Sequence, residues 1–91
     1  MGRTFSRSEN AMGELVDGEL VLLNMDSGEY FGLNATGTRI WALLAEHGDL
    51  DLVHEAMVRK YAVDPKRLRS DLEELIADLE RAGLVRETHV R

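Results

Sequence analysis

The 91-residue sequence contains no cysteine and no long apolar run. Without cysteine there is no disulfide framework, thiolate nucleophile or thiolate metal ligand, which fits a reducing cytoplasm. No apolar stretch approaches the roughly 20 residues that a membrane helix needs. Residues 1–8 also lack the apolar segment of a secretory signal peptide. We therefore expect a cytoplasmic protein with no membrane contact.

Recognisable catalytic patterns are also missing. The histidines His47, His54 and His89 are not spaced as metal ligands. No serine lies in a Gly-x-Ser-x-Gly elbow, and no glycine-rich segment ends in the Lys-Ser/Thr pair of a phosphate-binding loop. We expect no cofactor, no metal and no enzymatic activity of the chain alone.

Basic residues are too few for an obvious nucleic-acid surface, because the net charge is −6. The longest predicted helix, residues 65–82, has four basic side chains against five acidic ones, a net charge of −1. Asp26 and Glu29 make the preceding hairpin acidic as well. DNA binding remains an alternative, but we expect no nucleic acid as partner.

Turn residues divide the first third of the chain into three predicted strands, residues 12–16, 19–25 and 29–33. Asp17-Gly18 is typical of a two-residue hairpin, because both turn positions need a positive φ. Gly28 suits the left-handed position of a three-residue loop. The second strand is apolar on both faces, so either the N-terminal segment covers its outer face or that face self-associates.

Capping residues define three predicted helices in the remainder of the chain. Asn34 precedes a helix over residues 35–46, and Asp49 precedes one over residues 50–60. Asp64-Pro65 begins the third helix, and Gly83 follows its end. Its leucines and isoleucine recur at helical spacing and form a wide apolar stripe.

The order of these elements predicts an α+β, winged-helix-like fold, with a three-stranded antiparallel sheet followed by three helices. The expected domain spans residues 11–86, between an N-terminal tail (1–10) and a C-terminal tail (87–91).

In such a meander the third strand is a sheet edge. Tyr30 and Gly32 point to one face, and Phe31 and Leu33 to the other. We expect Leu33 and Trp41 to belong to the core. An exposed strand edge is a place where a peptide can dock, so binding is the first functional hypothesis.

The run from Tyr30 to Trp41, YFGLNATGTRIW, together with LERAGL ending at Leu84, resembles the PqqD-like family. More narrowly, the chain is similar to the stand-alone B1 proteins of lasso-peptide biosynthesis, which are recognition elements for ribosomally made precursor peptides. The resemblance covers roughly residues 18–85. PqqD proteins that act with a radical SAM enzyme typically carry Tyr-Pro-Glu before the Leu-Asn pair, and this chain lacks that motif.

The resemblance implies a non-catalytic adaptor that binds a precursor's leader peptide as an added strand beside the third helix. The implied partners are a separate leader peptidase, a B2-type cysteine protease, and a cyclase, with the adaptor a monomer or weak homodimer. A peptide chaperone for a radical SAM enzyme is the alternative within the family. The implied peptide-binding residues are Glu29, Tyr30, Phe31, Gly32 and Leu33 on the strand, and Arg67, Leu68, Asp71, Leu72 and Leu75 on the helix.

Overall fold

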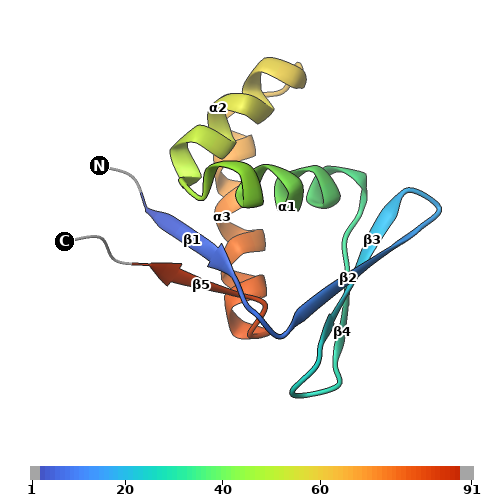
Figure 1. Ribbon diagram of the computed structural model, residues 1–91. Coiled ribbons are helices and arrows are strands. Elements are labelled where there is room, and N and C mark those ends of the chain that lie inside the picture. The colour runs from blue at the N-terminus through green and yellow to red at the C-terminus, as the bar shows by residue number, and fades with distance from the viewer. Residues whose placement is uncertain (1–2, 89–91) are drawn as a thin grey trace.

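The computed structural model describes residues 3–88 (Figure 1). Its elements follow the chain in this order: β1 (Thr4–Arg7), β2 (Ala11–Val16), β3 (Glu19–Asn24), β4 (Tyr30–Gly32), α1 (Ala35–His47), α2 (Leu50–Lys60), α3 (Pro65–Arg81) and β5 (Val85–Thr88). Strands β2, β3 and β4 form a three-stranded antiparallel sheet in that order, and β1 pairs with β5 in a separate two-stranded sheet. The predicted α+β class, with a three-stranded sheet followed by three helices, is confirmed.

The first turn of the meander has the predicted conformation. Asp17 and Gly18 have φ values of 52° and 83°, and Val16 pairs with Glu19 across them. The second turn has the predicted left-handed glycine, Gly28, with a φ of 76°. It is one residue longer than expected, because Asn24 and not Met25 stands opposite Glu29. Because the two turns fix the register, Leu22 lies between Gly13 and Phe31 on the inner face of the sheet and is fully buried.

The outer face of this sheet is open to solvent. Met12 and Tyr30 flank Leu23 in one cross-strand row, and they are 55% and 73% exposed. The expectation that the N-terminal segment covers this face is wrong, because β1 pairs with β5 instead. Self-association through the face stays a prediction.

The helices begin and end at the expected signals. The side chain of Asn34 accepts a 2.8 Å hydrogen bond from the backbone N–H of Gly37 at the start of α1. Asp49 caps α2 in the same way. Asp64 caps α3, where Pro65 occupies the first turn and leaves no helical hydrogen bond unmade.

One core joins all the helices to the inner face of the sheet. Leu22 from β3, Leu44 from α1, Met57 from α2 and Leu72 from α3 are at most 2% exposed. Leu33 and Trp41 belong to the same core, as expected. The short segment from β4 to α1 is therefore anchored at both ends.

The N-terminal segment is a strand from Thr4 to Arg7, not the polar tail expected over residues 1–10. Phe5 is 3% exposed in the core, and its backbone N–H donates to the carbonyl oxygen of Gly48. The guanidinium of Arg7 stacks over the Trp41 ring at 4.6 Å and donates to the Trp41 carbonyl oxygen. Burial lowers the pKa of this guanidinium. Phe5 is the one apolar residue of β1, so the sequence gives little sign of this strand. Its partner strand β5 lies about 80 residues further along the chain.

At the other terminus, β5 runs to Thr88 and so enters the tail expected over residues 87–91. The Oγ1 atoms of Thr4 and Thr88 lie 2.8 Å apart, and Arg3 forms a 3.0 Å ion pair with Glu87. His89 and the two residues after it lie outside the described residues. Within residues 3–88, the helices all fall short of the length and apolarity required to cross a bilayer.

Candidate functional site

One edge of β4 is unpaired, and the register shows which backbone groups it offers. The N–H of Asn24 donates to the carbonyl oxygen of Glu29, and the N–H of Leu33 donates to the carbonyl oxygen of Leu20. Successive residues of a strand direct their backbone groups to opposite sides. Residues 29, 31 and 33 therefore face β3, and the N–H and C=O groups of Tyr30 and Gly32 face away from it. No strand among residues 3–88 pairs with this side of β4.

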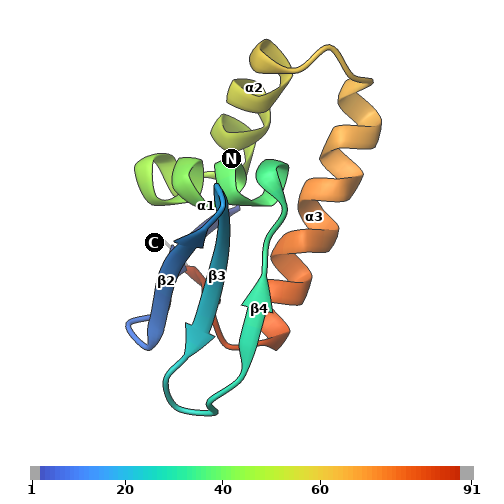
Figure 2. The same cartoon turned by 90° about the vertical axis from the view of Figure 1, so that its right-hand side faces the viewer.

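Helix α3 lies alongside this free edge (Figure 2). Between the two elements is a hollow of about 460 Å³, here the middle hollow, lined by Phe31, Gly32 and Leu33 on one side and by Asp71 and Leu75 on the other. A Cβ atom added to Gly32 would meet nothing within 4 Å. Backbone groups and apolar side chains therefore line the same open space, as peptide binding by strand addition requires.

The groove continues at both ends of the middle hollow. The lower hollow, of about 310 Å³, lies between Tyr30 and Phe31 and the α3 residues Asp78 and Arg81. The upper hollow, of about 440 Å³, shares Thr36 and Asp71 with the middle one. Three adjoining hollows thus form one groove along β4 and α3.

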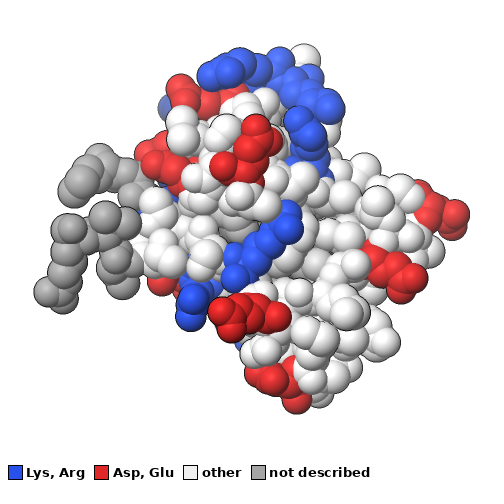
Figure 3. All heavy atoms as spheres, in the orientation of Figure 1, with Lys and Arg blue, Asp and Glu red and all other residues white. Residues whose placement is uncertain are grey.

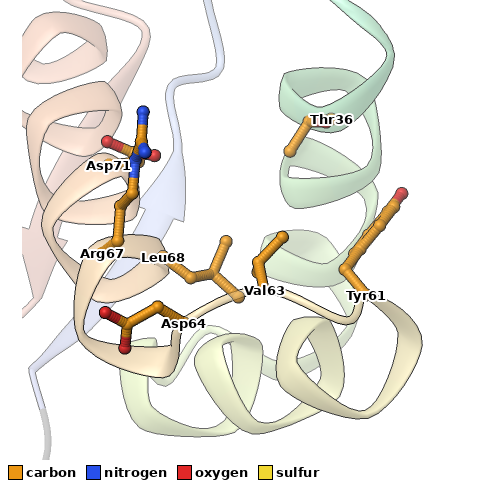
Figure 4. A pocket seen from close by; sticks show the side chains of 7 residues that line it. All are labelled: Thr36, Tyr61, Val63, Asp64, Arg67, Leu68 and Asp71. Atoms are coloured by element: carbon orange, nitrogen blue, oxygen red, sulfur yellow. The ribbon is translucent and has the colours of Figure 1, made fainter.

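The upper hollow has apolar walls and a charged rim (Figure 4). Tyr61 and Val63 come from the connector between α2 and α3, and Leu68 comes from α3. Figure 4 shows Arg67 and Asp71 extending from the same side of α3 above these residues. The hollow could hold an apolar side chain with a polar tip.

Two stripes of α3 divide its residues between groove and core. Arg67, Asp71, Leu75 and Asp78 recur every three or four residues and line the groove. The parallel stripe of Leu68, Leu72, Ile76 and Leu79 is buried. Within residues 3–88, Leu68 is the one member of the buried stripe that also lines a hollow, the upper one.

Of the ten residues predicted for peptide binding, nine line one of the three hollows. Leu72 does not: it is completely buried and packs in the core. Leu72 and Leu75 belong to the same apolar stripe in the sequence, so the pattern could not show that Leu72 faces the core. Leu75, by contrast, is half-buried and lines the middle hollow. Leu72 therefore belongs to the core and not to the groove.

The structure adds lining residues that the sequence had not indicated. Asp78 and Arg81 continue the helical spacing of Arg67 and Asp71, so this spacing could have identified them. Tyr61 and Val63 had no such signal, because only the tertiary fold brings the α2–α3 connector to the end of the groove.

The charge around the groove is uneven. Residues 8–38, which include the whole meander, contain six acidic residues and no lysine or arginine: Glu9, Glu14, Asp17, Glu19, Asp26 and Glu29. In the view of Figure 3, the side of the three-stranded sheet shows only acidic and uncharged surface, whereas lysine and arginine lie over the helices and around β1 and β5. On the α3 side of the groove, Arg81 forms an ion pair with Asp78 of the same helix.

Other charges on α3 serve to join the helices. Arg69 forms ion pairs of 2.8 Å with Glu73 and 2.7 Å with Asp51 of α2. Hydrogen bonds to these two carboxylates raise its pKa above the ordinary value. Among residues 3–88, no group of three or more histidine or carboxylate side chains is arranged to hold a metal ion.

Two solved structures are similar to this one over nearly their whole length. The first is described as TbiB1 in complex with the TbiA(beta) leader peptide. It is 31% identical, its TM-score is 0.84, and the match covers 94% of this chain and 99% of that one. The second is a lasso peptide synthetase B1 complexed with the leader peptide. It is 25% identical, its TM-score is 0.82, and the match covers 91% and 98% of the two chains.

Sequence comparison identifies the family. No protein in the curated set matches the sequence. The family profile described as coenzyme PQQ synthesis protein D matches residues 19–85, which run from the start of β3 to the start of β5 and include β4 and α3. This match covers well over half of the chain, and the chain belongs to the PqqD family.

Proposed function

We propose that this protein is a non-catalytic adaptor of lasso-peptide biosynthesis. It binds the leader segment of a ribosomal precursor peptide as an added strand on β4 and presents the precursor to a separate leader peptidase. The observation that carries the proposal is the free edge of β4 facing α3 across an apolar groove. The two similar solved structures, each a B1 protein with a leader peptide, support the same assignment.

The added strand would use the backbone groups that β3 leaves free. Tyr30 and Gly32 each offer one N–H donor and one C=O acceptor, so an antiparallel strand opposite them can form up to four ladder hydrogen bonds. Ladder hydrogen bonds favour an extended peptide of any sequence, and the hollows beside them supply side-chain selectivity.

Beyond the ladder hydrogen bonds, apolar contacts would supply most of the binding affinity. Burying two apolar side chains of the peptide in the groove contributes roughly 3–6 kcal/mol. The peptide loses conformational and translational freedom on binding, which offsets part of this gain. An affinity between micromolar and nanomolar follows. Holding the precursor beside the peptidase raises its effective concentration there.

The family match gives a second candidate, a peptide chaperone for a radical SAM enzyme. This candidate uses the same groove and differs only in the partner enzyme. DNA binding has less support. Residues 8–38 contain acidic residues but no lysine or arginine, and α3 has a net charge of −1, so both would repel phosphates. A pull-down with the purified peptidase or radical SAM enzyme, each with and without precursor, separates the two adaptor roles.

Replacing Gly32 with proline tests the strand directly. The Gly32 N–H points away from β3, so proline removes a donor on the free edge and leaves the β3–β4 ladder intact. We expect the affinity of the cognate leader peptide, measured by fluorescence polarisation, to fall at least about tenfold.

Gly13→Pro is the control for the lost edge donor. A Cβ atom at Gly13 would lie 3.1 Å from Cδ1 of Leu20, so circular dichroism first confirms that this variant is folded. Gly13 lies on β2, the other edge of the same sheet, and the register directs its N–H away from β3 as well. Both variants therefore lose one outward donor from an edge strand. Unchanged leader affinity in a folded Gly32→Pro protein, or an equal loss in Gly13→Pro, would show that β4 is not the docking strand.

A further inference from the structure

Asp71 occupies the centre of the groove, at the junction of the middle and upper hollows. We propose that Asp71 determines specificity by selecting a lysine or arginine at one position of the bound peptide, namely the residue opposite Leu33. This inference rests on the proposed strand addition to β4. It goes further by defining the peptide's charge and its register.

The register shows which peptide side chains face Asp71. In an antiparallel added strand, the residue opposite Gly32 shares its face and points to the outer side of the sheet. The residues opposite Phe31 and Leu33 point inward, into the middle hollow. The lower hollow joins Phe31 to Asp78, whereas Leu33 and Thr36 lie at the Asp71 end. The inward residue nearest Asp71 is therefore the one opposite Leu33.

Asp71 is available to bind a cation. It is exposed, and among residues 3–88 no ion pair or side-chain hydrogen bond engages its carboxylate. Asp78, the other acidic residue of α3 that lines the groove, is already paired with Arg81. Arg67 comes from the preceding turn of α3, and its side chain lies beside that of Asp71 in Figure 4. The ion pairs of residues 3–88 do not include one between them. Among residues 3–88, Asp71 is also the only charged residue that lines the middle hollow.

The surroundings fit a lysine or arginine side chain as a whole. Leu33, Ile40 and Leu75 line the same hollow and can cover the aliphatic stem, while the charged end meets Asp71 at the rim. The adjacent meander has six acidic and no basic residues over positions 8–38. Its field repels a carboxylate at this position and attracts a cation.

The adjoining hollows extend the inferred pattern. Inward positions of a strand recur every second residue. The residue opposite Phe31 meets Leu75 and follows the cation by two positions, and the inward residue before the cation reaches Tyr61, Val63 and Leu68 in the upper hollow. The selected pattern is an apolar residue, any residue, lysine or arginine, any residue, and an apolar residue.

A displayed library of random 15-residue peptides tests this pattern without knowledge of the natural precursor. The library is selected against the wild-type protein, Asp71→Lys and Glu74→Lys. Glu74 is the matched control, because it is an exposed acid on α3 that lines none of the three hollows. Circular dichroism confirms that each variant is folded.

We expect lysine or arginine at the central position with the wild type and Glu74→Lys, and aspartate or glutamate there with Asp71→Lys. In a selected peptide, Lys→Glu at this position should weaken binding to the wild type roughly five- to twentyfold and strengthen binding to Asp71→Lys. A shared strand pattern without charge preference, or a preference that Asp71→Lys leaves unchanged, overturns the role of Asp71 while peptide binding stands. Failure of the wild type to enrich any common pattern overturns both this inference and the proposed function.

Discussion

The Nδ2 atom of Asn24 donates a 2.8 Å hydrogen bond to the carbonyl oxygen of Ala82, which joins the end of β3 to the end of α3. The Oδ1 atom of Asn24 accepts from the backbone N–H groups of Asp26 and Ser27 in the following turn. Asn24 is only 9% exposed, so these hydrogen bonds are shielded from solvent. It therefore fixes the distance between the β3–β4 turn and α3 at the lower end of the groove.

Asn24→Ala should lower the free energy of unfolding by about 2–3 kcal/mol, because it leaves the Ala82 carbonyl and two turn N–H groups without their partner. Urea unfolding followed by circular dichroism measures the change. Asn10→Ala is the control, because Asn10 bonds to Asp26 at the surface and its loss should cost under about 1 kcal/mol. Equal effects of the two substitutions would contradict the role assigned to Asn24.

Gly83→Ala should be more destabilising than Gly18→Ala. Both glycines have positive φ, 73° and 83°, so both substitutions carry a backbone cost of about 1 kcal/mol. A Cβ atom at Gly83 would also lie 2.9 Å from Nδ2 of Asn24, whereas one at Gly18 would meet nothing within 4 Å. Urea unfolding should show a larger loss for Gly83→Ala, and this excess should shrink when Asn24 is also alanine.

Leu72→Ala and Leu75→Ala should separate stability from binding. Leu72 is completely buried, so its truncation should cost about 2–5 kcal/mol of folding free energy. Leu75 is half-buried and lines the middle hollow, so its truncation should cost about 1 kcal/mol but weaken the cognate leader peptide roughly fivefold. Unfolding and fluorescence polarisation are measured on both. Unchanged leader affinity in Leu75→Ala would exclude the middle hollow as a contact site.

Asn34→Ala should destabilise the protein by about 1 kcal/mol, because the side chain caps α1 through the 2.8 Å hydrogen bond from Gly37. Asn34→Asp keeps an acceptor at this position and should change the unfolding free energy by less than about 0.5 kcal/mol. Thermal and urea unfolding compare the two. If aspartate were as damaging as alanine, the cap would not be the reason that asparagine occupies the junction.

Local signals in the sequence determined most of the secondary structure. The Asp17-Gly18 turn, the caps at Asn34 and Asp49 and the Pro65 start of α3 all act over a few residues, so their effect does not depend on the rest of the fold. The alternation of Tyr30 and Gly32 with Phe31 and Leu33 likewise gave the two faces of β4.

Tertiary structure decided three things that the sequence by itself had not. It paired β1 with β5, because a strand pairing between the two ends of the chain leaves no local pattern. It turned Leu75 to the groove and Leu72 to the core, a rotation about α3 that a wide apolar stripe does not define. It also brought Tyr61 and Val63 to the upper end of the groove. The sequence indicated the strand edge, and packing of α3 beside that edge created the hollows from which a peptide's side chains are selected.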